Sequence, residues 1–139
     1  LFINGTLVGT AGIQFGKHFF DFVQTPYERV TSIGIFIFSE EFRRMGLGKT
    51  LVWAATFLSY HSFKEGNFGA GMLKNNTPSF KSFLSCGFRN VFENDEIICV
   101  LLNYPELIKP HFIEDVIINE IDQSTRTSQV NILSRNINH

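Results

Sequence analysis

The chain has 139 residues and a formal net charge of −1, with 44% hydrophobic and 18% charged residues. This length predicts one domain with a single core, and the composition excludes a disordered chain. The balanced charge gives no overall attraction to nucleic acid or to an anionic membrane, and the longest apolar runs have only the length of a strand. Cys86 and Cys99 lack any metal-ligand or C-x-x-C spacing. We therefore expect free thiols, no bound metal and a reducing, cytoplasmic location.

The first half of the chain reads as strands followed by a helix. Asn4-Gly5 between extended apolar residues predicts a β-hairpin, and residues 19–24 predict a further strand. Residues 29–38 are apolar on both faces, which is typical of a central strand covered on both sides by helices. Gly34 inside this strand indicates a bulge or the close approach of another backbone or a ligand. Residues 47–62 have the apolar spacing of a helix.

The second half continues with a short strand over 67–73. Thr77 as N-cap and Pro78 in the first turn predict a helix that Gly87 ends. Two further strands, 88–92 and 96–104, follow the helix.

From Pro105 the composition changes. An amphipathic piece over 111–121 precedes a tail rich in Asn, Ser, Thr and Gln. We therefore divide the chain into a domain of residues 1–104 and an extension of residues 105–139 that is partly amphipathic, then polar and disordered.

The segment RRMGLGKT, residues 43–50, ends like a nucleotide phosphate loop. Arg43 stands where the pattern G-x-x-x-x-G-K-(S/T) needs its first glycine, so an ATP site is excluded. The segment still joins a strand to the start of a helix, where unpaired N–H groups and the helix dipole favour a phosphate. The alternative is an ordinary strand-to-helix turn.

Two motifs and the order of the elements resemble the GNAT superfamily of acyl-coenzyme A-dependent N-acyltransferases. Residues 43–48 fit the pyrophosphate signature (Q/R)-x-x-G-x-(G/A), and residues 76–88 look like the segment N-x-x-(A/S)-x-x-x-(Y/F)-x-x-x-G-F. The resemblance covers about residues 2–104 and implies a mixed α/β fold, with a central twisted mixed sheet flanked by helices. The family normally carries a strand and two helices before this region, so we expect an N-terminally truncated domain.

The resemblance also implies a site for acetyl-CoA. The pyrophosphate would be bound by Arg43, Arg44, Met45, Gly46, Leu47, Gly48, Lys49 and Thr50. The backbone of Phe36, Ile37 and Phe38 would pair with the pantetheine arm, and Asn76 and Phe83 would contact the coenzyme from the other side. The alternatives are capping for Asn76, core packing for Phe83 and solvated charge for the two arginines.

The implied reaction is direct attack of an amine on the thioester. The N–H donor for the developing oxyanion would be the amide of Phe38. Candidates for the general base are Glu28 and Asp21, a water relay, or the histidines His18 and His61. Phe83 stands where many relatives have a tyrosine acid and cannot donate a proton, which leaves Ser82, Ser85 and Cys86 as polar alternatives nearby.

We therefore expect an N-acetyltransferase that acts on a small-molecule amine, such as an amino sugar, by analogy with aminoglycoside and sugar acetyltransferases. Two alternatives stay open: a non-catalytic GNAT-like module for coenzyme binding or protein interaction, and a protein or peptide N-acetyltransferase. The N-terminal half-hairpin and residues 111–121 are the candidate surfaces for a homodimer.

Overall fold

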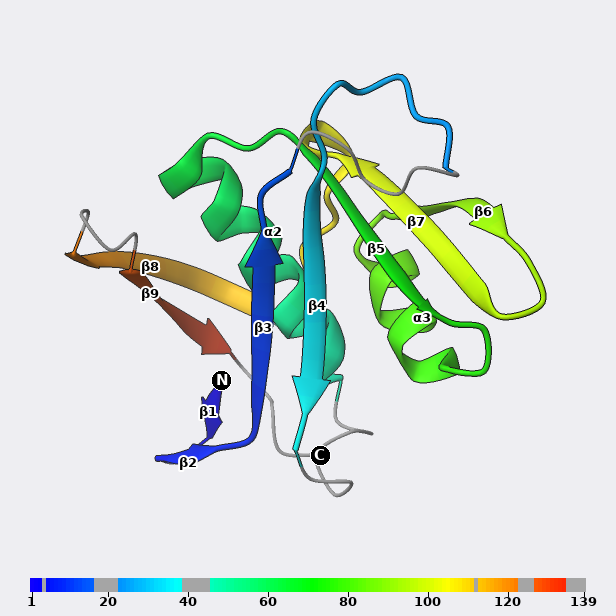
Figure 1. Cartoon of the computed structure of the whole chain (residues 1–139). Coiled ribbons are helices and arrows are strands. Elements are labelled where there is room, and N and C mark those ends of the chain that lie inside the picture. The colour runs from blue at the N-terminus through cyan, green and yellow to red at the C-terminus, as the bar shows by residue number, and fades with distance from the viewer. Residues whose placement is uncertain (4, 17–22, 39–45, 112, 123–126, 135–139) are drawn as a thin grey trace.

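The structure is a computed structural model that describes residues 1–3, 5–16, 23–38, 46–111, 113–122 and 127–134 (Figure 1). For residues 114–122 and 127–134 only the backbone is considered. The centre is a five-stranded mixed sheet in the order β3-β4-β5-β7-β6. Its strands are β3 (Gly9–Gln14), β4 (Thr31–Ile37), β5 (Asn67–Leu73), β6 (Arg89–Glu93) and β7 (Ile97–Asn103). The β4–β5 pair is parallel, and the other pairs in this sheet are antiparallel.

A small hairpin precedes this sheet, as the sequence predicts. β1 (Phe2–Ile3) pairs with β2 (Thr6–Leu7) across a two-residue turn. Gly5 in this turn has φ 81°, a left-handed conformation that glycine adopts without steric cost. The strand expected at 19–24 falls mainly outside the described residues.

Two helices cover one face of the sheet. They are α2 (Leu47–Phe63) and α3 (Thr77–Ser85). Alternate side chains of the strands, such as Ile33, Phe68 and Val100, form one core cluster with residues of both helices. On the other face, Phe36 is 55% exposed and Leu73 is 62% exposed. The sequence correctly places β4 inside the sheet, but the expectation that helices cover both of its faces is wrong for the described residues.

The ends of the helices have local causes. α2 begins after Gly46, which has φ 76°, and ends at Lys64, whose N–H donates to the Tyr60 carbonyl. α3 begins after Asn76, whose Oδ1 accepts a hydrogen bond from the Ser79 N–H at 3.3 Å. The predicted N-cap, Thr77, is therefore one residue too late. Neither helix in the described part of the chain has both the length and the apolar character needed to cross a membrane.

The C-terminal extension contains regular structure that the sequence analysis did not expect. After a short 3-10 turn, η1 (Tyr104–Glu106), the strands β8 (Ile113–Asp122) and β9 (Thr127–Ser134) form an antiparallel hairpin. Figure 1 places this hairpin beside α2, and β9 contacts that helix. β8 is rich in β-branched isoleucine and valine, which favour strands, whereas β9 has only Val130 and Ile132 among mostly polar residues. The polar residues between them had suggested disorder.

The feature that matters most for function is the parting of β4 from β5. β3 and β4 pair along six residues, from Gly9 to Gln14, whereas β4 and β5 pair only at Thr31↔Phe68 and Ser32↔Gly69. Beyond these two pairs the strands diverge, as Figure 1 shows. We call this unpaired region the β4–β5 gap.

Candidate active site

A cavity lies on the helix side of the β4–β5 gap. Its volume is about 290 Å³, and we call it the β4–α3 cavity. The residues that line it come from the end of β4, the first turn of α2 and the start of α3: Ile35, Phe36, Ile37, Gly48, Asn76, Pro78, Ser79 and Ser82. The two sequence motifs therefore meet at one place, because each contributes a wall of the same cavity.

The start of α2 is built to face an anion. Gly46 forms no side-chain cap, and the first turn contains no acidic residue. Among the described residues no side chain caps this helix start at Gly46, and the positive end of the helix dipole points to the same side. These are the features that hold a phosphate or pyrophosphate at a helix start. Arg43, Arg44 and Met45 lie outside the described residues.

The predicted pyrophosphate residues inside α2 differ in what they can offer. The side chains of Leu47 and Thr50 are buried, at 1% and 3% exposure. The Thr50 hydroxyl donates to the Gly46 carbonyl at 3.3 Å. Only the backbone of these two residues is available to a ligand, while Lys49 on the same turn is half-buried.

Gly48 has a packing role that the sequence did not reveal. A Cβ atom at this position would lie 2.5 Å from Ser82 Oγ and 3.6 Å from Ile35 Cδ1. The absent side chain therefore allows the first turn of α2 to approach α3 closely. Ser82 keeps its place by donating a hydrogen bond to the Pro78 carbonyl at 2.9 Å.

The backbone of β4 presents different N–H groups to its two neighbours. The Phe38 N–H donates to the Val8 carbonyl at 2.9 Å, so it points toward the β3 side. This hydrogen bond conflicts with the prediction that the Phe38 amide is the oxyanion donor. Because N–H groups of successive residues in a strand point to opposite sides, the Ile35 N–H faces the β4–β5 gap instead. The exposed rings of Phe36 and Phe38 lie together, with centroids 5.4 Å apart.

Asn76 caps α3, which is one of the two interpretations that the sequence left open, and its contact with the coenzyme stays a prediction. It caps α3 through Oδ1, and it also lines the β4–α3 cavity. Its side-chain Nδ2 has no hydrogen-bond partner among the described residues. The capping bond fixes the orientation of the amide, so that Nδ2 remains a donor held at the cavity wall.

Phe83 packs in the core rather than in the cavity. It is 2% exposed and meets Phe88 edge to face, with ring centroids 5.0 Å apart. Phe83 does not line the β4–α3 cavity, in line with the core-packing alternative. Its neighbour Ser82 does line it.

Cys86 can be set aside as an acid or nucleophile. Its side chain is fully buried, and burial raises the pKa of the thiol to about 12. The thiol donates to the Lys49 carbonyl at 3.3 Å, so it links the end of α3 to the first turn of α2. Cys86 therefore helps to hold the two helices that border the β4–α3 cavity, as a neutral side chain.

The candidate bases do not converge on the cavity. Glu28 is exposed in the segment before β4 and does not line the cavity. His61 lies near the C-terminal end of α2, with Nε2 3.2 Å from the Tyr104 hydroxyl. Asp21 and His18 fall outside the described residues. Among the residues that the structure covers, no three His, Cys, Asp or Glu side chains lie together as a metal site.

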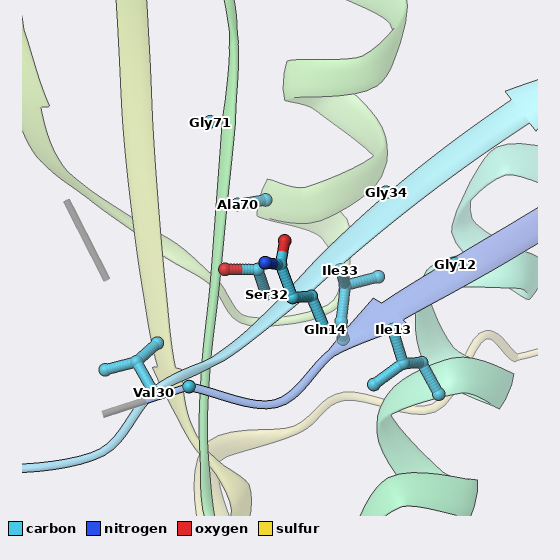
Figure 2. Close-up of a pocket in the computed structure, with 10 residues that line it drawn as sticks. Gly12, Ile13, Gln14, Val30, Ser32, Ile33, Gly34, Ala70 and Gly71 are labelled. Carbon is cyan, nitrogen blue, oxygen red and sulfur yellow. The ribbon is translucent and has the colours of Figure 1, made fainter. Parts of the chain in front are cut away.

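A second cavity lies on the opposite face of the sheet, where no described helix covers it. Figure 2 shows it between β3, β4 and β5, with a volume of about 480 Å³. We call it the glycine cavity because four of the residues lining it are glycines. The described residues that line it are Gly12, Ile13, Gln14, Gly16, Val30, Ser32, Ile33, Gly34, Ala70 and Gly71. Apart from Gly34, which the sequence marked for close approach, none of these residues was expected at a site.

The residues that sequence reasoning missed in the β4–α3 cavity are Ile35, Pro78 and Ser79. Ser79 and Ser82 lie one helical turn apart on α3, and Asn76 precedes Ser79 by the same spacing. This i, i+3 spacing was visible in the sequence and places the three on one side of the helix. The role of Ile35 was not visible, because it depends on the register between β3 and β4.

Comparison with known proteins supports this fold. A sequence profile of the acetyltransferase (GNAT) family matches residues 1–88. A comparison with curated proteins finds no match.

Several solved structures share the arrangement. AAC(6')-Ib in complex with ribostamycin and coenzyme A is 18% identical, with a TM-score of 0.60, and the match covers 76% of this chain and 62% of that one. The N-acetyltransferase PseH from Campylobacter jejuni, in complex with acetyl coenzyme A, is 18% identical, with a TM-score of 0.53 and coverage of 73% and 63%. An uncharacterized protein (bh2621) from Bacillus halodurans is 19% identical, with a TM-score of 0.59 and coverage of 74% and 56%.

At these identities the likeness concerns the fold, and the chain spans between 56% and 63% of the length of these three structures. The profile, in contrast, covers 88 of the 139 residues. The mixed α/β sheet, the two motifs at one cavity and this profile together lead to one conclusion: the chain belongs to the acetyltransferase (GNAT) family.

Proposed function

We propose that this chain is an N-acetyltransferase that moves an acetyl group from acetyl-CoA to a primary amine of a small molecule. The observation that carries the proposal is the β4–β5 gap beside the uncapped start of α2. One strand edge with unpaired positions and one helix start without an acidic cap offer backbone hydrogen bonds to an extended arm and to a pyrophosphate. The neighbours solved with coenzyme A or acetyl coenzyme A support the same choice of co-substrate.

We assign the residues as follows. Gly46, Leu47 and Gly48 would bind the pyrophosphate through backbone N–H groups. Asn76 would donate from Nδ2 to the pantetheine arm, and the Ile35 N–H would stabilise the charge that develops on the acetyl oxygen. Gly48 and Asn76 line the β4–α3 cavity, and Gly46 and Leu47 stand at the start of the helix that forms one of its walls.

The reaction itself is an exchange of one bond for another. The nitrogen of a neutral amine attacks the carbonyl carbon of the thioester, the C–N bond forms, the C–S bond breaks, and the coenzyme leaves as its thiolate. The ammonium first loses one proton to solvent or to a base, for which Glu28 remains a candidate through water. After the attack the nitrogen loses a second proton, which balances the protonation of the departing thiolate. A thiol with a pKa near 8.5 needs little acid assistance to leave, so the absence of a hydroxyl at Phe83 is compatible with turnover.

The proposal is tested by calorimetric titration of acetyl-CoA into the chain and into two variants at one position. Gly46→Gln and Gly46→Glu impose the same strain on the left-handed backbone, but only the glutamate places a negative charge at the helix start. We expect acetyl-CoA to bind the wild-type chain, and Gly46→Glu to bind at least tenfold more weakly than Gly46→Gln. Equal affinities of the two variants, or no binding by the folded wild-type chain, would reject the site.

One observation favours a second candidate, a non-catalytic module that binds the coenzyme. Phe83 is a buried core residue where many relatives have a tyrosine acid. Such a module would bind acetyl-CoA with the same dependence on Gly46 and transfer no acetyl group to any amine. Mass spectrometry of amine probes after incubation with acetyl-CoA separates the two candidates. A homodimer remains a further proposal, which sedimentation of the chain would test.

A further inference from the structure

The glycine cavity occupies the point where β4 and β5 separate. If the parallel ladder continued past Ser32↔Gly69, the next pairs would join Ile33 to Ala70 and Gly34 to Gly71. These four residues line the cavity instead. Figure 2 shows the two strands diverging above Ser32, with Gly34 and Gly71 on opposite sides of the opening.

The two cavities follow one another along β4. Residues 32–34 line the glycine cavity, and residues 35–37 line the β4–α3 cavity. The first lies on the open face of the sheet and the second on the helix side. A thioester held in the β4–α3 cavity would therefore meet an amine in the glycine cavity at the β4–β5 gap.

The fold of the described residues gives no reason for two of the glycines. Gly12 and Gly34 face each other across β3 and β4. A Cβ atom at either would meet no atom within 4 Å, and neither residue has positive φ. Glycine weakens a strand, so this pair lowers stability without serving packing or conformation here. By contrast, a Cβ atom at Gly9, which lies on β3 like Gly12, would lie 2.9 Å from the Phe36 carbonyl oxygen, so packing does require glycine there.

The lining that the described residues give the glycine cavity is uncharged. None of the ten lining residues within the described part of the chain is acidic or basic, and the polar side chains among them are those of Gln14 and Ser32, which face each other across β3 and β4. An amide and a hydroxyl can each donate and accept hydrogen bonds. An ammonium group in this lining would lose hydration without gaining a counter-charge, and the cost rises with every further ammonium.

We propose that the glycine cavity binds the acceptor, and that the acceptor is a compact monoamine with an uncharged, hydroxyl- or amide-bearing body rather than a polycationic aminoglycoside. The inference rests on the proposed acetyl transfer and adds the class of acceptor. Gly12 and Gly34 determine specificity by leaving room for the body, while Gln14 and Ser32 bind its polar groups. The volume of about 480 Å³ suits a small molecule.

The test measures kcat/KM for acetyl transfer to three monoamines (glucosamine, galactosamine and ethanolamine), to paromomycin and to a tripeptide with a free α-amine. We expect at least one monoamine to exceed paromomycin and the tripeptide tenfold. Gly34→Val should lower transfer to that monoamine at least tenfold, while the dissociation constant of acetyl-CoA changes less than twofold. Gly66→Val is the matched control, since a Cβ atom at Gly66 also meets nothing within 4 Å and Gly66 lies outside both cavities.

Binding is read separately from turnover. In the presence of desulfo-CoA, the preferred monoamine should shift the amide NMR signals of Gly12, Gly34 and Gly71 and leave that of Gly66 in place. Preference for paromomycin or the tripeptide, an unchanged kcat/KM in Gly34→Val, or no transfer to any monoamine by a chain that binds acetyl-CoA would overturn the inference. Failure of acetyl-CoA binding would instead reject the proposed function itself.

Discussion

At the level of single residues, the two glycines of the pyrophosphate motif have different physical roles. Gly46 supplies a left-handed turn with φ 76°, whereas Gly48 supplies space for Ser82. The motif accepts Gly or Ala at the second position, but in this chain Ser82 restricts it to Gly. The requirement at Gly48 therefore depends on a residue 34 positions later in the sequence.

This dependence predicts non-additive stabilities. Gly48→Ala should lower the free energy of unfolding by about 1–3 kcal/mol, because the new methyl group overlaps Ser82 Oγ. In a Ser82→Ala background the new Cβ would face the remaining Cβ at 3.4 Å, an ordinary contact. We expect the same substitution to cost at least ~1 kcal/mol less there, as measured by urea unfolding of the four proteins. Equal costs in both backgrounds would contradict the close approach of α2 and α3.

The buried thiol of Cys86 predicts a pH dependence. Burial raises its pKa from 9.0 to about 12 in the folded chain. Above pH 9 the thiol ionises in the unfolded chain but not in the folded one, so the free energy of unfolding falls as pH rises toward 12. The contribution is up to about 1.4 kcal/mol per pH unit.

Comparison of wild-type and Cys86→Ala stability at pH 8 and pH 10 isolates this contribution, because the second buried thiol, Cys99, is present in both proteins. The wild-type chain should lose more stability than Cys86→Ala between the two pH values. Parallel losses would show that Cys86 is ionised, or accessible to solvent, in the folded chain.

The position of a residue near the cavity was predictable from the sequence where a motif determines it. It was not predictable where side-chain packing determines it. Gly48 and Asn76, one from each motif, line the same cavity, and Gly46 directly precedes α2. Their roles toward the coenzyme stay predictions. The Phe38 donor conflicts with the Val8 hydrogen bond, because the direction of an N–H group depends on strand register, which composition does not encode. The burial of Phe83 could be assigned only once the hydrophobic core was known. The roles of Arg43 and Arg44 in pyrophosphate binding remain predictions.

At the level of elements, α3 combines a structural cap and a cavity wall in one side chain. Asn76 accepts the Ser79 N–H with Oδ1 and presents Nδ2 to the β4–α3 cavity. Substitution can separate these two roles because aspartate caps a helix as well as asparagine but has no N–H group.

Asn76→Asp should therefore leave the free energy of unfolding within ~0.5 kcal/mol of wild type and weaken acetyl-CoA binding at least fivefold. Asn76→Ala should weaken binding and also lower stability by about 1 kcal/mol through loss of the cap. Thermal unfolding and calorimetric titration of both variants provide the two measurements. Wild-type affinity in Asn76→Asp would limit Asn76 to capping.

The elements themselves followed from the sequence where periodicity and turn residues agree. The strand over 67–73 and the helix from Leu47 have the expected starts, and the turn at Asn94 forms because its Oδ1 accepts the N–H groups of Glu96 and Ile97. The hairpin of β8 and β9 was missed because the polar residues of its turn and second strand resemble a disordered tail. Its strands are stabilised by pairing with each other, which a window of single-sequence periodicity does not capture.

At the level of the whole molecule, the β4–β5 gap predicts where the backbone will respond to the coenzyme. The Ile35 N–H faces the gap, whereas the Phe38 N–H is already bonded to Val8. Acetyl-CoA bound along β4 should slow hydrogen exchange at Ile35 at least tenfold more than at Phe38. Exchange followed by NMR with and without acetyl-CoA measures the ratio. Equal slowing at both amides would indicate overall stabilisation by ligand binding rather than occupation of the gap.

The separation of β4 from β5 divides the five-stranded sheet into two hydrogen-bonded halves, which pack on one hydrophobic core. β3 and β4 form a complete ladder of their own, as do β5, β7 and β6, and only two residue pairs join the two ladders. With so few hydrogen bonds between the ladders, the angle between the halves depends on the volume of the side chains packed beneath them, such as Val52 and Phe68. A methyl group added to or removed from this core would widen or narrow the β4–β5 gap while both ladders stay intact, so the width of the gap can change through residues that line neither cavity.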